Sequence, residues 1–411
     1  MAEAKQSLNV FVTGGAEGVG LAAVRALMRR GHKVVATACD AEGALAVRLA
    51  GALPVYPDLS RASEVLSNLE LAKADAVVHA GPQFYGGLPH ASLDYVPYTD
   101  QLVSFTAAVI QAAKAHRVHR FVSLSFGYLY EAAHGAAKEG DRDARDSDYA
   151  PMLEAETILR DSGLDGFIIR SGYIYGGNSD PTAALAKSIK KSRTLPSGAK
   201  SASWIHEDDL AAAIVSLLEA ESNVAGVETI NAADDAPRSP DEFVGAMCDA
   251  LGLSAPGFAG DGFLAVLRQK TFRDKLLERE IVINSDALRH RFAWHPGHSK
   301  FESGLEATAL TWRMKDAVDA DDFYNDYQDK AAEAIASFVY DAVLPEPVPE
   351  AETSAPAPAG ASAEPAPAKA AAPPSSDGPT PWNEDDAKRE ERRRKALERK
   401  AKRAARQSGG S

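Results

Sequence analysis

The stretch that decides the fold runs from residue 9 to residue 27 and reads NVFVTGGAEGVGLAAVRAL. It starts as a short run typical of a buried strand, passes through a glycine-rich turn and continues with the apolar spacing of a helix. Glycines in such a turn allow a tight bend and let backbone N–H groups approach a pyrophosphate, which the N-terminus of the following helix also attracts. The stretch therefore predicts a strand, a dinucleotide-binding loop and a helix.

Outward from this stretch, as far as about residue 231, strand-like runs alternate with helical segments. The runs are NVFVT, KVVATA, LPVYP, DAVVHA, RFVSLS and GFIIRS, and segments such as LAAVRALMRR and QLVSFTAAVIQAAKAH lie between them. This order is typical of a parallel sheet covered by helices on both faces. The predicted fold class is α/β, a Rossmann-type doubly wound parallel sheet followed by a smaller C-terminal lobe.

The chain divides into four predicted parts. Residues 1–231 form the dinucleotide-binding domain, with some insertions that belong to the substrate lobe, and residues 232–343 form a smaller, mostly helical lobe. Eleven of the 23 prolines lie in residues 345–381, so residues 344–381 are predicted to be a disordered Pro/Ala-rich linker. Residues 382–411 form a basic tail whose order of charges also suits a helix.

The charge is distributed unevenly. The net charge is -13, yet residues 388–406 carry a local charge of +8, which leaves -21 for the rest of the chain. An acidic body disfavours nucleic acid along the main domain, whereas the tail predicts a protein or anionic partner for residues 382–411. A solvated tail without a partner is the alternative.

Composition predicts a cytoplasmic protein without membrane insertion. No apolar run approaches the ~18 residues that a membrane helix needs, and the N-terminus does not resemble a signal peptide. Cys39 and Cys248 lie far apart, which suits a reducing compartment. No group of His, Cys and Asp has the sequence spacing of a metal site, so no metal is predicted.

Several motifs in order resemble the short-chain dehydrogenase/reductase superfamily, in its extended NAD-dependent epimerase/dehydratase branch. Besides the glycine loop they are VYPDLS, VVHAGPQ, ETILRDSGLDGFIIRSGYIYGG, SWIHEDDLAAAIVSLLEA and ALRHRFAWHPGHSKFESGLEATALTW, and together they cover residues 8–316. The resemblance implies a small-molecule substrate, such as a sugar nucleotide with a hydroxyl or keto group. It also implies a homodimer.

The same resemblance implies a set of dinucleotide contacts, with Asp58 at the adenine ring. Asp40 follows the second strand, where NAD users have an acid, and Glu17 would repel the 2'-phosphate of NADP, so NAD is favoured over NADP. A solvated turn acid explains Asp40 equally well. The predicted cofactor-binding residues are Gly14, Gly15, Gly18, Val19, Gly20, Asp40, Asp58, Leu59, Ala80, Gly81 and Ser123.

The catalytic pair of the family is incomplete. Working members use a tyrosine, a lysine four residues later that lowers the tyrosine pKa, and a serine or threonine. One register of DYAPMLEAE places Asp148 and Met152 at the pair, and a shift by one places Tyr149 and Leu153 there, so neither has the lysine. The candidates are Ser125, Tyr149 and Tyr128, and a helix start at Pro151 explains the segment without chemistry.

Two further aromatic residues, Tyr173 and Tyr175, are predicted to wall the substrate cleft, with buried packing as the alternative. His79 and His206 are interpreted as structural histidines. Two functions stay open. One is an NAD(P)-dependent oxidoreductase or epimerase. The other is a catalytically impaired NAD(P)-binding scaffold or redox sensor that docks partners through its C-terminal tail.

Overall fold

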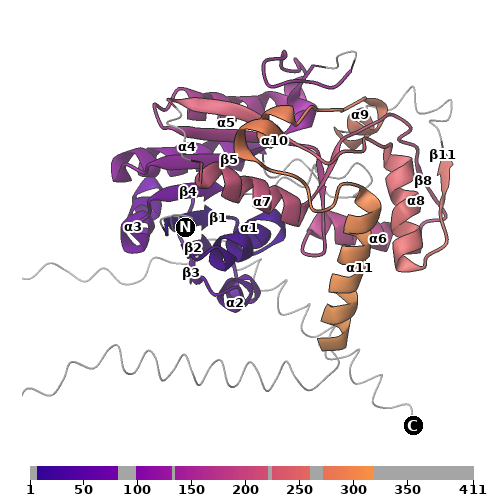
Figure 1. Cartoon of the computed structure of the whole chain (residues 1–411), viewed down its shortest axis with the longest axis horizontal. Coiled ribbons are helices and arrows are strands. Elements are labelled where there is room, and N and C mark those ends of the chain that lie inside the picture. The colour runs from indigo at the N-terminus through magenta and orange to yellow at the C-terminus, as the bar shows by residue number, and fades with distance from the viewer. Residues whose placement is uncertain (1–6, 82–98, 132–134, 221–224, 260–271, 319–411) are drawn as a thin grey trace, which may run out of the picture. The chain divides into compact units, whose positions relative to one another are not determined.

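Seven parallel strands form the central sheet of the protein (Figure 1). Their order across the sheet is β10, β6, β5, β4, β1, β2, β3. The strands are β1 (Asn9–Thr13), β2 (Lys33–Thr37), β3 (Leu53–Val55), β4 (Ala76–His79), β5 (Arg120–Phe126), β6 (Gly166–Ser171) and β10 (Val227–Ala232). The computed structural model describes residues 7–81, 99–131, 135–220, 225–259 and 272–318.

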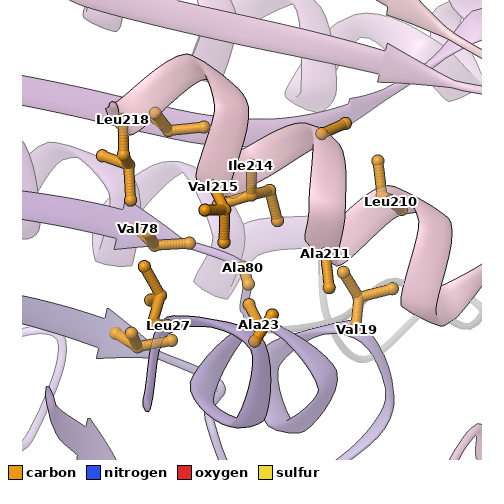
Figure 2. Packing of buried hydrophobic residues seen from close by; sticks show 14 of the residues in the cluster. Val19, Ala23, Leu27, Val78, Ala80, Leu210, Ala211, Ile214, Val215 and Leu218 are labelled. Carbon is orange, nitrogen blue, oxygen red and sulfur yellow. The ribbon is translucent and has the colours of Figure 1, made fainter. Parts of the chain in front are cut away.

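Helices cover both faces of this sheet. On one face α1 (Gly18–Arg29) packs against α7 (Glu207–Leu218), and on the other α4 (Thr99–His116) packs between α3 (Ala62–Ala72) and α5 (Ala150–Arg160). Figure 2 shows the first of these layers, in which Ala23 and Leu27 of α1 face Ile214 and Val215 of α7. α2 (Ala41–Leu49) connects β2 with β3. The doubly wound α/β fold is thereby confirmed.

Successive side chains of a strand point to opposite faces of the sheet, so they pack into different cores. Phe167 and Ile169 of β6 belong to the core under α1 and α7, whereas Ile168 belongs to the core under α3, α4 and α5. Every residue of β4 and β6 is buried, as expected for central strands of a parallel sheet. The six strands predicted from the sequence are all present.

A second apolar core lies beyond the carboxyl ends of the strands. In it the rings of Trp204 and Phe243 stack with centroids 4.0 Å apart. The elements around it include two short strand pairs, β7 (Tyr173–Tyr175) with β9 (Trp204–His206) and β8 (Thr194–Pro196) with β11 (Gly257–Ala259). The helices of this region are α6 (Asp180–Lys191), α8 (Pro240–Leu251), α9 (Phe272–Glu278), α10 (Asp286–Phe292) and α11 (Phe301–Val318).

Several predictions fall on residues outside the described part of the chain: the Pro/Ala-rich linker, the basic tail and a helix expected over residues 321–342. The boundaries of the four predicted parts stay predictions. In the described residues, no helix has both the length and the apolar character that crossing a bilayer requires.

Candidate functional site

The candidate site lies at the switch point of the sheet. From β1 the chain continues to β2 and β3 on one side, whereas β4, β5, β6 and β10 lie on the other side. Ligands of open α/β sheets bind outside the carboxyl ends of the strands at such a point. A narrow cleft with a volume of about 50 Å³ lies here. The lining residues used below are Val19, Ala80, Gly81, Ser123, Ser125 and Met152.

The glycine loop passes very close to the end of β4. Gly14 has a φ of +65°, and a Cβ on it would lie 2.8 Å from Gly81 Cα. A Cβ on Gly20 would collide with the carbonyl oxygen of Gly14. Gly15 is packed as tightly, because a Cβ there would lie 2.7 Å from Ala36 Cβ. The loop can follow this path only with glycine at these positions.

The first amide of α1 is held by a segment from the other side of the cleft. Gly18 N–H donates to the carbonyl oxygen of Asn178 over 2.9 Å. Asn178 is anchored in turn, because its backbone N–H and its side-chain Nδ2 donate to Glu207 Oε1 over 3.0 and 2.7 Å. Glu207 is buried at the start of α7. The loop between β7 and α6 therefore ties the glycine loop to α7.

The mouth of the glycine loop is acidic. The pKa of Glu17 is raised, first by partial desolvation and then by repulsion from the carboxylates of Asp180 and Asp40. A glutamate at the N-cap of α1 suits the helix dipole. The three acids also oppose a further negative charge brought by a ligand.

The predicted acids at the adenosine end make local hydrogen bonds. Asp40 accepts from Gly43 N–H over 2.8 Å as the N-cap of α2. Asp58 accepts from the amide and hydroxyl of Ser60, which lower its pKa. Leu59 is partly buried and packs against the core under α3. None of these three described residues lines the cleft.

His79 at the end of β4 is a fully bonded core histidine, as interpreted from the sequence. The Thr13 hydroxyl donates to Gly81 O over 3.0 Å, so it accepts from His79 Nδ1 over 2.8 Å. His79 Nε2 then accepts from the Thr106 hydroxyl over 3.0 Å. Burial lowers the pKa of His79 to about 4, which keeps the ring neutral.

Ser125 is hydrogen-bonded to a buried ion pair formed by Glu156 and Arg170. Its hydroxyl donates to Glu156 Oε1 over 2.5 Å. Arg170 binds both oxygens of Glu156, over 2.9 and 2.6 Å, and Arg160 adds a third contact at 2.7 Å. Burial opposes ionisation of Glu156, but the hydrogen bond and charge of Arg170 lower its pKa overall. Ser125 lines the cleft, and its hydroxyl hydrogen is engaged in the bond to Glu156.

In the first of the two registers of DYAPMLEAE, Asp148 and Met152 occupy the positions of the family's tyrosine and lysine. Met152 lines the cleft, and its sulfur accepts from the Tyr128 hydroxyl over 3.4 Å. Asp148 pairs with Lys275 of α9 at 2.6 Å, and Lys275 also binds Asp146 at 2.9 Å. Lys275 is thus engaged with carboxylates outside the cleft.

Tyr149 has a cation beside it, but from a distant part of the chain. Arg279 Nη1 donates to the Tyr149 hydroxyl over 2.7 Å, and the same guanidinium binds the carbonyl oxygens of Tyr128 and Tyr130. Burial raises the pKa of Tyr149 more than Arg279 lowers it. Tyr149 borders a separate pocket with Lys275 and Arg279. This phenol is buried and protonated.

The two predicted wall residues lie in the second core. Tyr173 packs on Trp204, and Tyr175 packs on His206 and Phe243. Burial raises the pKa of both phenols. Ile174, between them in β7, lines the cleft. Their positions correspond to the buried-packing alternative of the sequence analysis.

Sequence reasoning did not single out several residues that shape this site. Asn178, Glu156 and Arg279 act through partners that are 160, 31 and 130 residues away. Only Glu156 and Arg170 left a local signal, because they lie within the run ETILRDSGLDGFIIRSGYIYGG.

The family model described as NAD(P)H-binding matches residues 14–221, which span the glycine loop, β4, β5 and the cleft. The chain belongs to this NAD(P)H-binding family. No curated protein matches the sequence closely enough to count as a relative.

Among solved structures, this NAD(P)H-binding chain is similar in fold to extended short-chain epimerases and dehydratases. A dTDP-glucose 4,6-dehydratase from Bacillus anthracis, in complex with NAD, is 18% identical with a TM-score of 0.60, over 75% of this chain and 97% of that one. A UDP-glucose 4-epimerase from Thermotoga maritima with UDP-glucose is 17% identical with a TM-score of 0.60, over 74% and 99%. A UDP-glucuronic acid 4-epimerase from Bacillus cereus, with UDP-glucuronic acid and NAD, is 18% identical with a TM-score of 0.61, over 74% and 99%.

The backbone at the switch point is of the kind that binds a dinucleotide, and Asn178 occupies the first amide of α1. The close approach of Gly14 to Gly81 leaves backbone, rather than side chains, at the mouth of the cleft, and Val19, Ala80 and Gly81 line it with small or apolar groups. Glu17 and its two acidic neighbours suit a ligand without an additional phosphate.

Proposed function

We propose that this NAD(P)H-binding protein keeps a nicotinamide dinucleotide as a bound ligand and has lost the proton-transfer chemistry of epimerases and dehydratases. It acts through contacts that respond to the bound dinucleotide. The observation that carries this proposal is the position of Met152, a thioether that lines the cleft where the family register expects a lysine.

The neighbouring groups support the same conclusion. A phenol exchanges a proton near neutral pH only when a cation or hydrogen bonds lower its pKa enough. The pKa of Tyr149 is instead raised by burial, and its hydroxyl is held by Arg279. The Ser125 hydroxyl donates its hydrogen bond to the Glu156 carboxylate. No lysine lines the cleft in the described residues.

The groups proposed to hold the dinucleotide follow from the sequence analysis. The glycine loop, Gly14 to Gly20, would face the pyrophosphate, Asp58 and Leu59 the adenine, and Ala80, Gly81 and Ser123 the nicotinamide half. When bound, the dinucleotide supplies a nicotinamide ring able to accept or donate a hydride. NAD is the proposed cofactor rather than NADP, because Glu17 lies beside Asp40 and Asp180.

A second candidate function is an active oxidoreductase or epimerase on a sugar nucleotide. Its support is the likeness of the fold to dehydratases and epimerases that were crystallised with NAD and UDP-sugars. Under this alternative, Tyr128 beside Met152 is the candidate proton donor. The reaction would need another residue to replace the lysine.

The basic tail gives the first proposal a route to a partner. Residues 388–406 carry +8 on a chain whose remainder carries -21, and a proline-rich segment precedes them. A flexible linker raises the local concentration of a tethered segment at a partner. Residues 382–411 are therefore proposed to dock a protein or another anionic partner, in the cytoplasm.

The test combines binding with turnover on the full chain. NADH and NADPH are titrated by calorimetry, and absorbance at 340 nm is followed with a panel of UDP- and dTDP-sugars. We expect NADH to bind more tightly than NADPH, and the absorbance of the bound cofactor to stay constant with every sugar. Turnover of any sugar nucleotide, or failure to bind either dinucleotide, would contradict the proposal.

Two lysine variants test which of the two registers, Asp148/Met152 or Tyr149/Leu153, places a lysine where it can support catalysis. Asp148→Tyr with Met152→Lys restores the pair in the first register, at a position that lines the cleft. Leu153→Lys is the matched control, because it places a lysine four residues after Tyr149, whose hydroxyl is bound by Arg279. We expect any gain of cofactor oxidation in the double variant alone. A gain from Leu153→Lys would mean that Tyr149 reaches the substrate.

A further inference from the structure

Three potential metal ligands gather at the start of α7, away from the cleft residues described above. His206 ends β9, Asp208 lies in the first turn of α7, and His298 comes from the segment between α10 and α11. One ligand atom from each lies within 4.8 Å of the other two. His206 Nδ1 is 3.7 Å from an oxygen of Asp208, and the two imidazole centroids are 4.5 Å apart.

The backbone that carries His298 is held in place by Asp209. The Asp209 carboxylate accepts from Gly297 N–H over 2.7 Å and from His298 N–H over 3.0 Å. The indole N–H of Trp294 donates to the Asp209 carbonyl over 3.0 Å. These bonds fix the segment against α7, so His298 stays beside His206 without a ligand.

The hydrogen bond of His206 to Thr308 assigns the ring proton to Nε2, so the lone pair is on Nδ1, the nitrogen that faces Asp208. The Thr308 hydroxyl donates to Gly304 O over 2.9 Å, so toward His206 Nε2, at 3.5 Å, it accepts. Nδ1 then carries the lone pair, and its present contact with Asp208 N–H is long, at 3.3 Å. Metal-binding histidines commonly donate their other ring N–H to an oxygen in this way.

The surroundings favour a positive charge. Glu207, Asp208 and Asp209 all lie in the first turn of α7, where they offset the positive end of the helix dipole. Asp234 is buried close enough to Asp209 to feel its charge, and Asp234 Oδ2 has no hydrogen-bond partner among the described residues. The three acids in the first turn of α7 favour a cation beside them.

We propose that His206, Asp208 and His298 bind one divalent transition-metal ion of the zinc class. Two imidazoles and one carboxylate are ligands that zinc accepts, whereas calcium and magnesium prefer oxygen alone. Metal–ligand bonds of about 2.0–2.2 Å would draw the three ligand atoms closer together. The Asp208 side chain is 55% exposed, so it can swing to close the site and leaves a fourth position for water.

Spacing along the sequence could not reveal this cluster, because 92 residues separate the two histidines. The ion would pin the segment before α11 to the start of α7. None of its ligands lines the cleft.

The test uses the metal-free full-length chain, titrated with Zn²⁺ by calorimetry and with Co²⁺ by visible absorption. We expect one equivalent of Zn²⁺ to bind, and one equivalent of Co²⁺ to give the intense absorption of a four-coordinate site. His298→Ala should weaken binding by about 100-fold or more, and Asp208→Asn by about 10-fold, since loss of an outer partner alone costs 10–100-fold. His295→Ala is the matched control, because it removes an exposed imidazole from the same segment outside the cluster.

The outcomes separate a built site from surface binding. Unchanged Zn²⁺ affinity in His298→Ala and Asp208→Asn, equal losses in His295→Ala, or no one-equivalent phase in the wild type would overturn the proposal. Circular dichroism of each variant checks the fold. Because Asp208 is exposed, its variant keeps the test valid if His298→Ala unfolds.

Discussion

The backbone N–H of Gly18 donates to the carbonyl oxygen of Asn178 over 2.9 Å, so the first amide of α1 already has an acceptor. Helix N-terminal amides are the groups that bind phosphate oxygens in dinucleotide sites. A pyrophosphate that uses this amide must displace Asn178. The buried Glu207, which accepts from both nitrogens of Asn178, opposes that displacement.

Removing the anchor of Asn178 should therefore strengthen dinucleotide binding. Asn178→Ala deletes the 2.7 Å bond from Nδ2 to Glu207 and leaves the backbone contacts. One hydrogen bond to a carboxylate contributes about 1.5 kcal/mol, so we expect NADH affinity to rise by about tenfold. Calorimetry measures it. Asn68→Ala, in α3, is the control, and weaker binding by Asn178→Ala would mean that this side chain contacts the dinucleotide itself.

The acidic mouth of the glycine loop should set the preference between the two dinucleotides. Glu17→Gln removes the charge that lies beside Asp40 and Asp180. We expect affinity for NADPH to rise about fivefold more than affinity for NADH, as Coulomb interactions in a partly solvated site allow. Parallel titrations of both cofactors check this. An equal rise for both would place the 2'-phosphate elsewhere.

The pH dependence of NADH binding should follow from the same carboxylate. The pKa of Glu17 is raised above its ordinary value of 4.5, so Glu17 becomes neutral early as the pH falls. Binding of the anionic dinucleotide should strengthen as the pH decreases through that raised pKa, and this trend should be smaller in Glu17→Gln. An identical trend in the variant would assign the effect to another group.

The Glu156–Arg170 ion pair should contribute to the free energy of unfolding of the protein. Glu156→Gln leaves Arg170, which is 1% exposed, with Asp143 at 2.7 Å as its remaining carboxylate partner among the described residues, so the loss should lie below the value of about 3–5 kcal/mol that an uncompensated buried charge costs. The pKa of Glu156 is lowered, so its stabilising effect is present above pH 4.5 and is lost as the pH falls through the folded-state pKa. Urea unfolding at pH 7 and pH 4 should show a loss that shrinks in acid.

The exposed Glu154, on the same helix, provides the control for that experiment. Glu154→Gln should change the free energy of unfolding by no more than about 0.5 kcal/mol. A loss of similar size in both variants would argue that the helix, and not the ion pair, is responsible.

Asp234 should destabilise the protein increasingly as the pH rises. Burial raises its pKa from 3.8 to about 8, so folding takes up a proton between these values. Asp234→Asn removes that cost, and its stabilising effect should grow by up to about 1.4 kcal/mol per pH unit over this range. Thermal unfolding at pH 5 and pH 8 measures the difference. Asp235→Asn, at an exposed residue, should show a smaller growth, because the charge of Asp235 only adds to the effect of burial on the Asp234 pKa.

Strands and glycines of the fold were predictable because their signals are local. The run GFIIRS is apolar enough for a strand buried on both faces, and β6 is buried throughout. Gly14 and Gly20 belong to the glycine loop, and a Cβ at either position would clash with neighbouring backbone atoms. Short-range pattern and steric demand coincide at these residues.

The site was harder to predict because its decisive contacts join distant residues. The family pattern has a lysine four residues after the tyrosine, where this chain has Leu153, and the structure supplies Arg279, 130 residues after Tyr149 and away from the cleft. The partner of Gly18 lies at Asn178 and that of Ser125 at Glu156. Spacing shows which residues are missing, whereas only packing shows what stands in their place.

The strand order also has a consequence for the newly made chain. Val10 of β1 pairs with Ala76 of β4, 66 residues later, so the two strands that flank the switch point emerge far apart in time. At 5–20 residues per second, synthesis of that interval takes about 3–13 s. The glycine loop therefore leaves the ribosome several seconds before Gly81, against which it packs, and a nascent chain gains its dinucleotide cradle only after β4 has been made.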